Sequence, residues 1–194
     1  MRDLIIVPIV HSSPDMGSMK EALEKESIAK IGKERWEENQ RKVENFWDEV
    51  EAAIDALDLS CGKVRVYQDG MPCGGELGGR IVREVADKGS RNYQIVRKLI
   101  ERGATLEATE DPKLLLKEYE HVKQFADATT EREKMEAKEQ YEQIKEKLLH
   151  DRDEFIARAI GSTLKDGETG ILFIGASHDV KSELPQEVEV RGLD

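Results

Sequence analysis

Three short apolar runs, separated by long charged stretches, restrict this chain to few folds. The runs lie at residues 4–10, 64–67 and 170–175, and they are rich in branched aliphatic and aromatic side chains. Runs of this kind, bounded by glycine, proline or polar turn residues, are typical of buried strands. Residues 188–190 predict a further strand at an edge, and residues 104–109 fit either a short strand or an extended connection.

Helical patterns fill the chain between these runs. The first pattern carries apolar residues at steps of three and four and is interrupted near Gly32. The last covers roughly 50 residues, and one straight helix of that length would extend about 75–80 Å. Because that length is too great for a compact domain of this size, we expect a bend near residues 127–130. The predicted helical stretches are 18–58, 81–85, 93–100 and 112–164.

Alternating strands and helices predict an α/β fold with a small, mostly parallel sheet flanked by helices. We expect one domain over residues 1–194, with a charged helical insertion at about 112–150 before the last strong strand. Within it, residues 131–147 carry few apolar side chains and many Glu and Lys residues at helix-pair spacing. They predict a solvated helix that projects from the core. The alternative is a coiled-coil seam, through which charged helices would form a homodimer.

The charge balance excludes broad classes of function. The chain has 30 Lys and Arg against 41 Asp and Glu, a net charge of −11. Such a surface repels phosphate, so nucleic acid is not an expected partner. No apolar run approaches the roughly 18–20 residues of a membrane-spanning helix. Residues 4–10 are too short for a signal peptide and contain Pro8, so we expect a cytoplasmic protein with Cys61 and Cys73 reduced.

An ionisable residue follows each of the three strong strands. His11 follows the first, Asp69 the second and His178 the third. Parallel neighbouring strands would bring these side chains to one edge of the sheet, where α/β proteins bind ligands. Two imidazoles and a carboxylate are a common ligand set for a divalent metal with open positions. We therefore expect His11, Asp69 and His178 to hold a divalent metal; each of them, taken alone, also fits a structural role in a turn or the core.

Other residues compete for roles at this site. Glu110 is a reserve carboxylate for the ligand set or for general base chemistry, although an acidic residue before Pro112 also suits a helix N-terminus. Glu107 competes for the same role. Glycines at residues 70–79 surround Cys73 and predict a mobile loop over the strand ends. The loop matches neither phosphate-binding glycine motif, and no base for a Cys73 nucleophile is identifiable by spacing.

The second half of the chain resembles a known family. Asp-Arg-Asp-Glu-Phe-Ile-Ala-Arg-Ala-Ile at residues 151–160, then Thr163-Leu164, then Gly-Ile-Leu-Phe-Ile-Gly-Ala-Ser-His at residues 170–178 look like the closing section of the TraB/Tiki/GumN group. That group belongs with the ChaN-like and erythromycin-esterase-like proteins. In it, an Arg-Asp or Arg-Asn helix precedes a strand that ends in G-x-x-H. An earlier strand carries another G-x-x-H, and the next one ends in a carboxylate.

The resemblance implies roles for particular residues. Gly175 to His178 corresponds to the second G-x-x-H motif, and Pro8 to His11 to the first, with Pro8 in place of the glycine. Asp69 takes the carboxylate position, where the group typically has Glu, and Arg152 lines the site. Members of the group include metal-dependent proteases, hydrolases of a cyclic ester and haem-binding proteins.

The leading functional hypothesis is therefore a metal-dependent hydrolase of an amide, ester or phosphoester bond in a small-molecule or peptide substrate. Arg152 would hold an anionic group or transition-state charge. Acid–base chemistry by the same residues without a metal is a variant of this hypothesis. Two alternatives belong to other classes. One is a non-catalytic protein that binds a small ligand, haem or a metal in the same pocket. The other is an assembly protein that acts through its charged helices.

Overall fold

A computed structural model describes residues 2–10, 20–57 and 59–193 of the chain. These residues form an α/β fold, in which seven helices flank a five-stranded sheet with only parallel pairings. The strand order is β3-β2-β4-β1-β5. The strands are β1 (Arg2–Ile9), β2 (Val64–Gln68), β3 (Thr105–Leu106), β4 (Thr169–Gly175) and β5 (Val188–Gly192). The helices are α1 (Lys20–Ile31), α2 (Lys33–Ala56), α3 (Gly75–Asp87), α4 (Arg91–Glu101), α5 (Pro112–Asp127), α6 (Glu131–Thr163) and α7 (Val180–Glu183).

The predicted fold class and strands are confirmed. The ambiguous residues 104–109 contain only the two-residue strand β3, and β5 lies at the edge beside β1, as expected. None of the helices in the described ranges combines the length and the apolar content that crossing a membrane requires.

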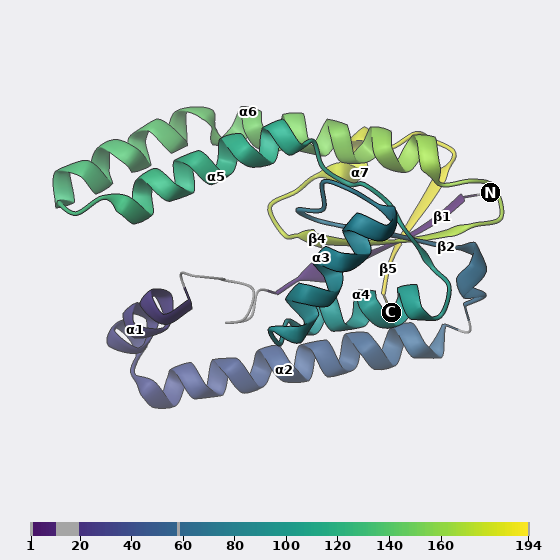
Figure 1. Cartoon of the computed structure of the whole chain (residues 1–194), viewed down its shortest axis with the longest axis horizontal. Helices are drawn as coiled ribbons and strands as arrows, with labels where there is room; N and C mark the ends of the chain where they lie inside the picture. Colours follow the sequence, from purple (N-terminus) through teal and green to yellow (C-terminus); the bar gives the residue numbers. More distant parts are fainter. Residues whose placement is uncertain (1, 11–19, 58, 194) are drawn as a thin grey trace.

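Hydrophobic packing on both faces explains why the strands read as continuous apolar runs. Side chains along a strand point to alternate faces, so Ile171 and Phe173 pack with α2, α3 and α4, while Leu172 and Ile174 pack with α6 and α7. Figure 1 shows these two helical layers on opposite sides of the sheet. Only 38% of the residues of the whole chain are hydrophobic, yet those in the sheet and its flanking helices form a buried core.

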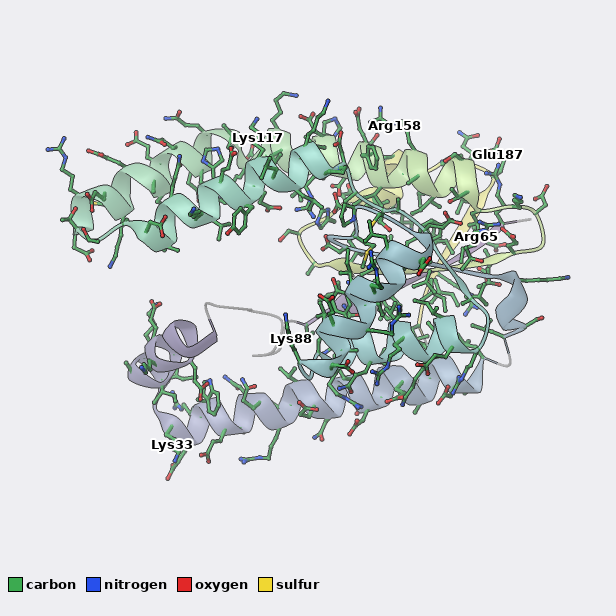
Figure 2. The ribbon with its side chains drawn as sticks, in the orientation of Figure 1. Lys33, Arg65, Lys88, Lys117, Arg158 and Glu187 are labelled. Atoms are coloured by element: carbon green, nitrogen blue, oxygen red, sulfur yellow. The ribbon has the colours of Figure 1, made fainter. Side chains whose placement is uncertain are left out.

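Two interruptions divide the long helical stretches where the sequence predicts them. Gly32 separates α1 from α2 and has a φ of 83°, a left-handed conformation that glycine adopts without strain. A turn at residues 128–130 separates α5 from α6, and the two helices form a hairpin that extends away from the sheet (Figure 1). Charged side chains are frequent along this hairpin (Figure 2), as expected for a solvated helix at residues 131–147, but α5 also exposes the apolar side chains of Leu116, Tyr119 and Phe125.

A capping box fixes the start of α6 and predicts a pH effect. Glu133 Oε2 accepts hydrogen bonds from the backbone N–H groups of Thr130 and Thr129, both at 2.9 Å. These bonds lower the pKa of Glu133 from 4.5 to about 2. The folded state therefore gains stability from Glu133 above pH 4.5 and loses it as the pH falls towards about 2. NMR of the Glu133 carboxyl carbon should give a titration midpoint near pH 2. A midpoint near pH 4.5 would contradict the capping box.

The glycine-rich segment is a helix start, not a loop over the strand ends. Gly75, Gly78 and Gly79 lie in the first turns of α3, so the predicted mobile loop at residues 70–79 is wrong over its second half. The physical reason is close packing. A methyl group at Gly78 would collide with the Cys73 carbonyl oxygen and come within 2.9 Å of Leu106 Cδ2.

Gly78→Ala should therefore destabilise the protein by about 1–3 kcal/mol, the usual cost of overpacking. Gly79→Ala is a matched control, because its methyl group would meet only Arg83 Nη1, at 3.5 Å. Alanine favours a helix over glycine by up to about 1 kcal/mol, so this second variant should be neutral or stabilised. Urea denaturation followed by circular dichroism measures both effects. Equal effects of the two variants would show that the close approach at Gly78 does not constrain the fold.

Candidate metal centre

Neighbouring parallel strands bring Asp69 and His178 to the same edge of the sheet. Asp69 directly follows β2, and His178 follows β4, which pairs with β2. The Asp69 backbone N–H donates to the Phe173 carbonyl oxygen at 2.9 Å. The Gly175 backbone N–H donates to Asp69 Oδ2 at 3.1 Å, which fixes the carboxylate at the end of β4. The sheet itself therefore sets the relative positions of these two side chains.

Glu110 reaches the same place from the connection between β3 and α5. The backbone N–H groups of Thr109 and Glu110 both donate to the Met71 carbonyl oxygen, at 2.9 and 3.1 Å. These bonds tie the connection to the turn that follows β2. The Glu110 residue is only 1% exposed, so its carboxylate depends on protein groups for solvation.

Arg152, on α6, joins three carboxylates. Its Nη2 donates to Asp69 Oδ1 at 2.7 Å and to Glu110 Oε1 at 2.6 Å. Its Nε donates to Glu110 Oε2 at 3.2 Å, and its Nη1 to Glu118 Oε2 at 2.5 Å. Arg152 therefore uses its donors on the protein's own carboxylates, and it orients Asp69 and Glu110 as a pair.

His178 has a defined ring orientation. Its Nδ1 lies 2.5 Å from Asp153 Oδ1, and the other oxygen of Asp153 accepts the backbone N–H of Asp179 at 2.9 Å. A carboxylate accepts hydrogen bonds, so it favours the tautomer with the proton on Nδ1. The remaining ring nitrogen, Nε2, then presents its lone pair to Asp69 Oδ2, 3.6 Å away. A carboxylate that holds a histidine in this way is typical of metal-binding histidines.

The charges at this edge do not balance. Asp69, Glu110 and Glu118 share the single guanidinium of Arg152. Burial raises the pKa of Glu110, Arg152 opposes that shift, and the neighbouring Asp69 adds to it. Three ionised carboxylates exceed the one guanidinium, and the raised pKa of Glu110 means that burial disfavours its negative charge; a bound cation would favour the ionised form.

The geometry suits one ion held by three residues. Asp69, Glu110 and His178 each offer a ligand atom, and these three atoms all lie within 4.8 Å of one another. Two ligands about 2.1 Å from a tetrahedral zinc ion lie about 3.4 Å apart. The 3.6 Å between Asp69 Oδ2 and His178 Nε2 is close to that separation and too long for a hydrogen bond. These residues could therefore hold a divalent metal.

A cavity of about 390 Å³ opens beside these residues. Its wall combines the sheet edge with the hairpin, because Tyr141 and Lys145 of α6 line it together with His178. The Tyr141 hydroxyl donates to Glu118 Oε1 at 3.4 Å and so connects the hairpin to the carboxylate cluster. The cavity has room for a small molecule.

The structure places the predicted site residues in three ways. Asp69, His178, Glu110 and Arg152 come together, and Glu110 lies with Asp69 and His178 as a potential ligand. His11 lies outside the described residues. Glu107, the competitor of Glu110, lies elsewhere and pairs with Arg65, whose Nε also donates to Glu168 Oε2 at 2.6 Å.

Two residues of the site have no predicted role in the sequence analysis. Asp153 orients His178, and Glu118 contacts Arg152. A signal for the first does exist in the sequence. Asp153 lies three, four and seven residues before the apolar Ile156, Ala157 and Ile160, so it falls within the apolar face of α6, where a carboxylate needs a polar partner. Nothing in the sequence pattern singles out Glu118 among the acidic residues of α5.

This chain matches no protein-family model, and no match is found among curated proteins or solved structures. What the fold and site define is a parallel α/β protein with a histidine and two carboxylates able to hold a metal ion. A function can therefore be inferred only from the geometry of the site.

Proposed function

We propose that this protein is a metal-dependent hydrolase of an amide, ester or phosphoester bond. One observation carries the proposal: His178 Nε2 faces Asp69 Oδ2 at 3.6 Å, beside Glu110 and at the mouth of a cavity. Both atoms are electron-pair donors and repel each other. A cation bound between them would attract both and so stabilise this arrangement. A bound divalent ion would lower the pKa of a water molecule and polarise the oxygen of the bond under attack.

Other residues of the site would orient the metal ligands, accept a proton and stabilise negative charge. Asp153 holds the Nδ1 proton of His178 and keeps Nε2 available as a ligand. Arg152 orients Asp69 and Glu110, because four of its five N–H donors bind carboxylates of the protein; the fifth donor, on Nη1, would serve its expected role of holding an anionic substrate group. Glu118 lines the cavity and is placed to accept a proton. Lys145, also on the cavity wall, pairs with Glu142 and would have to leave that ion pair to meet a developing negative charge.

The resemblance to the TraB/Tiki/GumN group supports the same reaction class. The G-x-x-H residues Gly175 to His178 follow β4, and Asp69 ends the adjacent strand β2. Arg152 and Asp153 lie in α6, the helix before β4. Arg152 contacts Asp69, and Asp153 contacts His178. Members of the group include metal-dependent hydrolases, and this arrangement is what such chemistry would use.

A hydrolase screen tests the proposal. The purified full-length chain would be assayed on amide, ester and phosphoester substrates with Zn²⁺, Mn²⁺ or no added metal. We expect hydrolysis that needs metal and that falls at least about 100-fold in His178→Ala. His150→Ala is the control, because the His150 side chain is 57% exposed on α6. Activity that survives His178→Ala would remove this mechanism. Metal binding without turnover of any substrate would favour a binding protein.

A further inference from the structure

A second cavity, of about 410 Å³, lies against the other side of the carboxylate cluster. Asp69, Glu118 and Arg152 line both this cavity and the one beside His178. Two amide side chains, Gln68 and Asn92, and Tyr93 also line it. This amide cavity is therefore adjacent to the candidate metal site, and it is not used by the chemistry proposed above.

The two amides are buried without full hydrogen bonding. Gln68 is 1% exposed and Asn92 is 2% exposed. Among the residues that the structure describes, neither Gln68 Oε1 nor Asn92 Oδ1 has a hydrogen-bond partner. For Gln68 the orientation is set, because its Nε2 donates to the Asp69 carbonyl oxygen at 3.2 Å. An exchange of the oxygen and nitrogen would place two acceptors against each other.

Buried acceptors without donors are rare, because they give up their bonds to water and gain nothing in return. Gln68 and Asn92 both line this cavity, so a ligand bound there would supply the missing donors once the two amide groups turn towards it. Each amide oxygen accepts a hydrogen bond, so the complementary group carries N–H or O–H donors.

Charge selects between these donors. The amide cavity is lined by the carboxylates of Asp69 and Glu118 and by the guanidinium of Arg152. Arg152 donates to both of these carboxylates and to Glu110 as well, so its charge is more than compensated. Two carboxylates and one guanidinium thus line the cavity, so its lining is net negative in the metal-free chain and favours a positively charged donor.

We propose that the amide cavity binds a cationic N–H donor, an ammonium or guanidinium group, on the substrate of this enzyme. This inference rests on the proposed function, because only an enzyme would treat the bound cation as part of a substrate. It names the chemical class of that substrate. Gln68 and Asn92 would accept from the cation while Asp69 and Glu118 provide charge, and the bond to be hydrolysed would lie on the His178 side of the cluster.

Binding of small probes to the full-length chain tests this proposal. Ethylammonium and methylguanidinium would be titrated and followed by NMR, with propanol and propionate as matched probes that lack the cationic donor. We expect saturable shifts at Gln68 and Asn92 with the two cations and none with propionate. Absence of binding by both cations, or equal binding of propionate, would overturn the proposal.

Variants of Asn92 separate recognition from packing. Asn92→Leu keeps the approximate volume and removes the acceptor, so cation affinity should fall by roughly tenfold or more. The melting temperature of this variant without probe should rise, because an unpartnered buried oxygen is gone. Asn92→Asp retains an acceptor and adds charge, so it should bind the cations at least as tightly as the native protein. Asn39→Leu, on the exposed face of α2, is the control. Native affinity in Asn92→Leu with a lower melting temperature would make Asn92 purely structural and overturn the proposal.

The two proposals fail in different ways. The probe titrations need no metal and no turnover. Cation binding at Gln68 and Asn92 without any hydrolysis would keep the cation site and remove the hydrolase. Metal-dependent hydrolysis of neutral or anionic substrates, with no cation binding, would do the reverse.

Discussion

Arg152→Met should destabilise the protein by about 3–5 kcal/mol, the usual result of removing one partner from a buried ion pair. The Arg152 side chain is 7% exposed and that of Glu110 is 0% exposed. Without the guanidinium, Glu110 and Asp69 face each other with no compensating charge. Urea denaturation followed by circular dichroism gives the change in free energy of unfolding.

Two further variants show whether charge is the cause. Arg158→Met, at an exposed position on the same helix (Figure 2), should change stability by less than about 0.5 kcal/mol. Glu110→Gln combined with Arg152→Met should recover part of the loss, because it removes the stranded charge. If Arg152→Met and Arg158→Met cost the same, Arg152 does not hold the cluster together.

Removal of His178 should have the second large effect, on metal affinity. Isothermal titration calorimetry of Zn²⁺ into the metal-free native chain should show one ion per chain. His178→Ala removes one of three ligands and should weaken that binding by more than about 100-fold. Asp153→Asn leaves the ligands in place and disturbs only the orientation of His178, so it should weaken binding by about 10–100-fold.

Stability provides an independent readout of the same effect. At a free Zn²⁺ concentration of about 100 times Kd, binding should stabilise the native chain by about 2.7 kcal/mol. His178→Ala should lose this gain, whereas the exposed-site variant His150→Ala should keep it. Equal stabilisation of native and His178→Ala proteins would place the ion elsewhere.

Much of the fold follows from local sequence patterns. β4 is an apolar run between glycines, and α4 begins where Ser90 caps it by accepting the Tyr93 backbone N–H at 3.4 Å. Such signals act over a few residues, so a single sequence contains them. The prediction of a mobile loop from the glycine segment was wrong because Gly78 allows close packing against Leu106. That contact belongs to tertiary structure, so local sequence does not reveal it.

The site is only partly predictable for the same reason. Asp69 and His178 meet because both follow strands of one parallel sheet, and the sequence predicts that much. Glu110 joins them only because β3 lies next to β2, a strand order that no local pattern contains. Asp153 and Glu118 come from helices, and the packing of those helices on the sheet decides whether their carboxylates face inwards.

The most direct test of the metal centre is anomalous diffraction from crystals of the full-length protein grown with Zn²⁺. We predict one strong peak about 2.0–2.2 Å from His178 Nε2 and from carboxylate oxygens of Asp69 and Glu110. A peak that leaves His178 uncoordinated, or no peak at this edge of the sheet, would contradict the assignment.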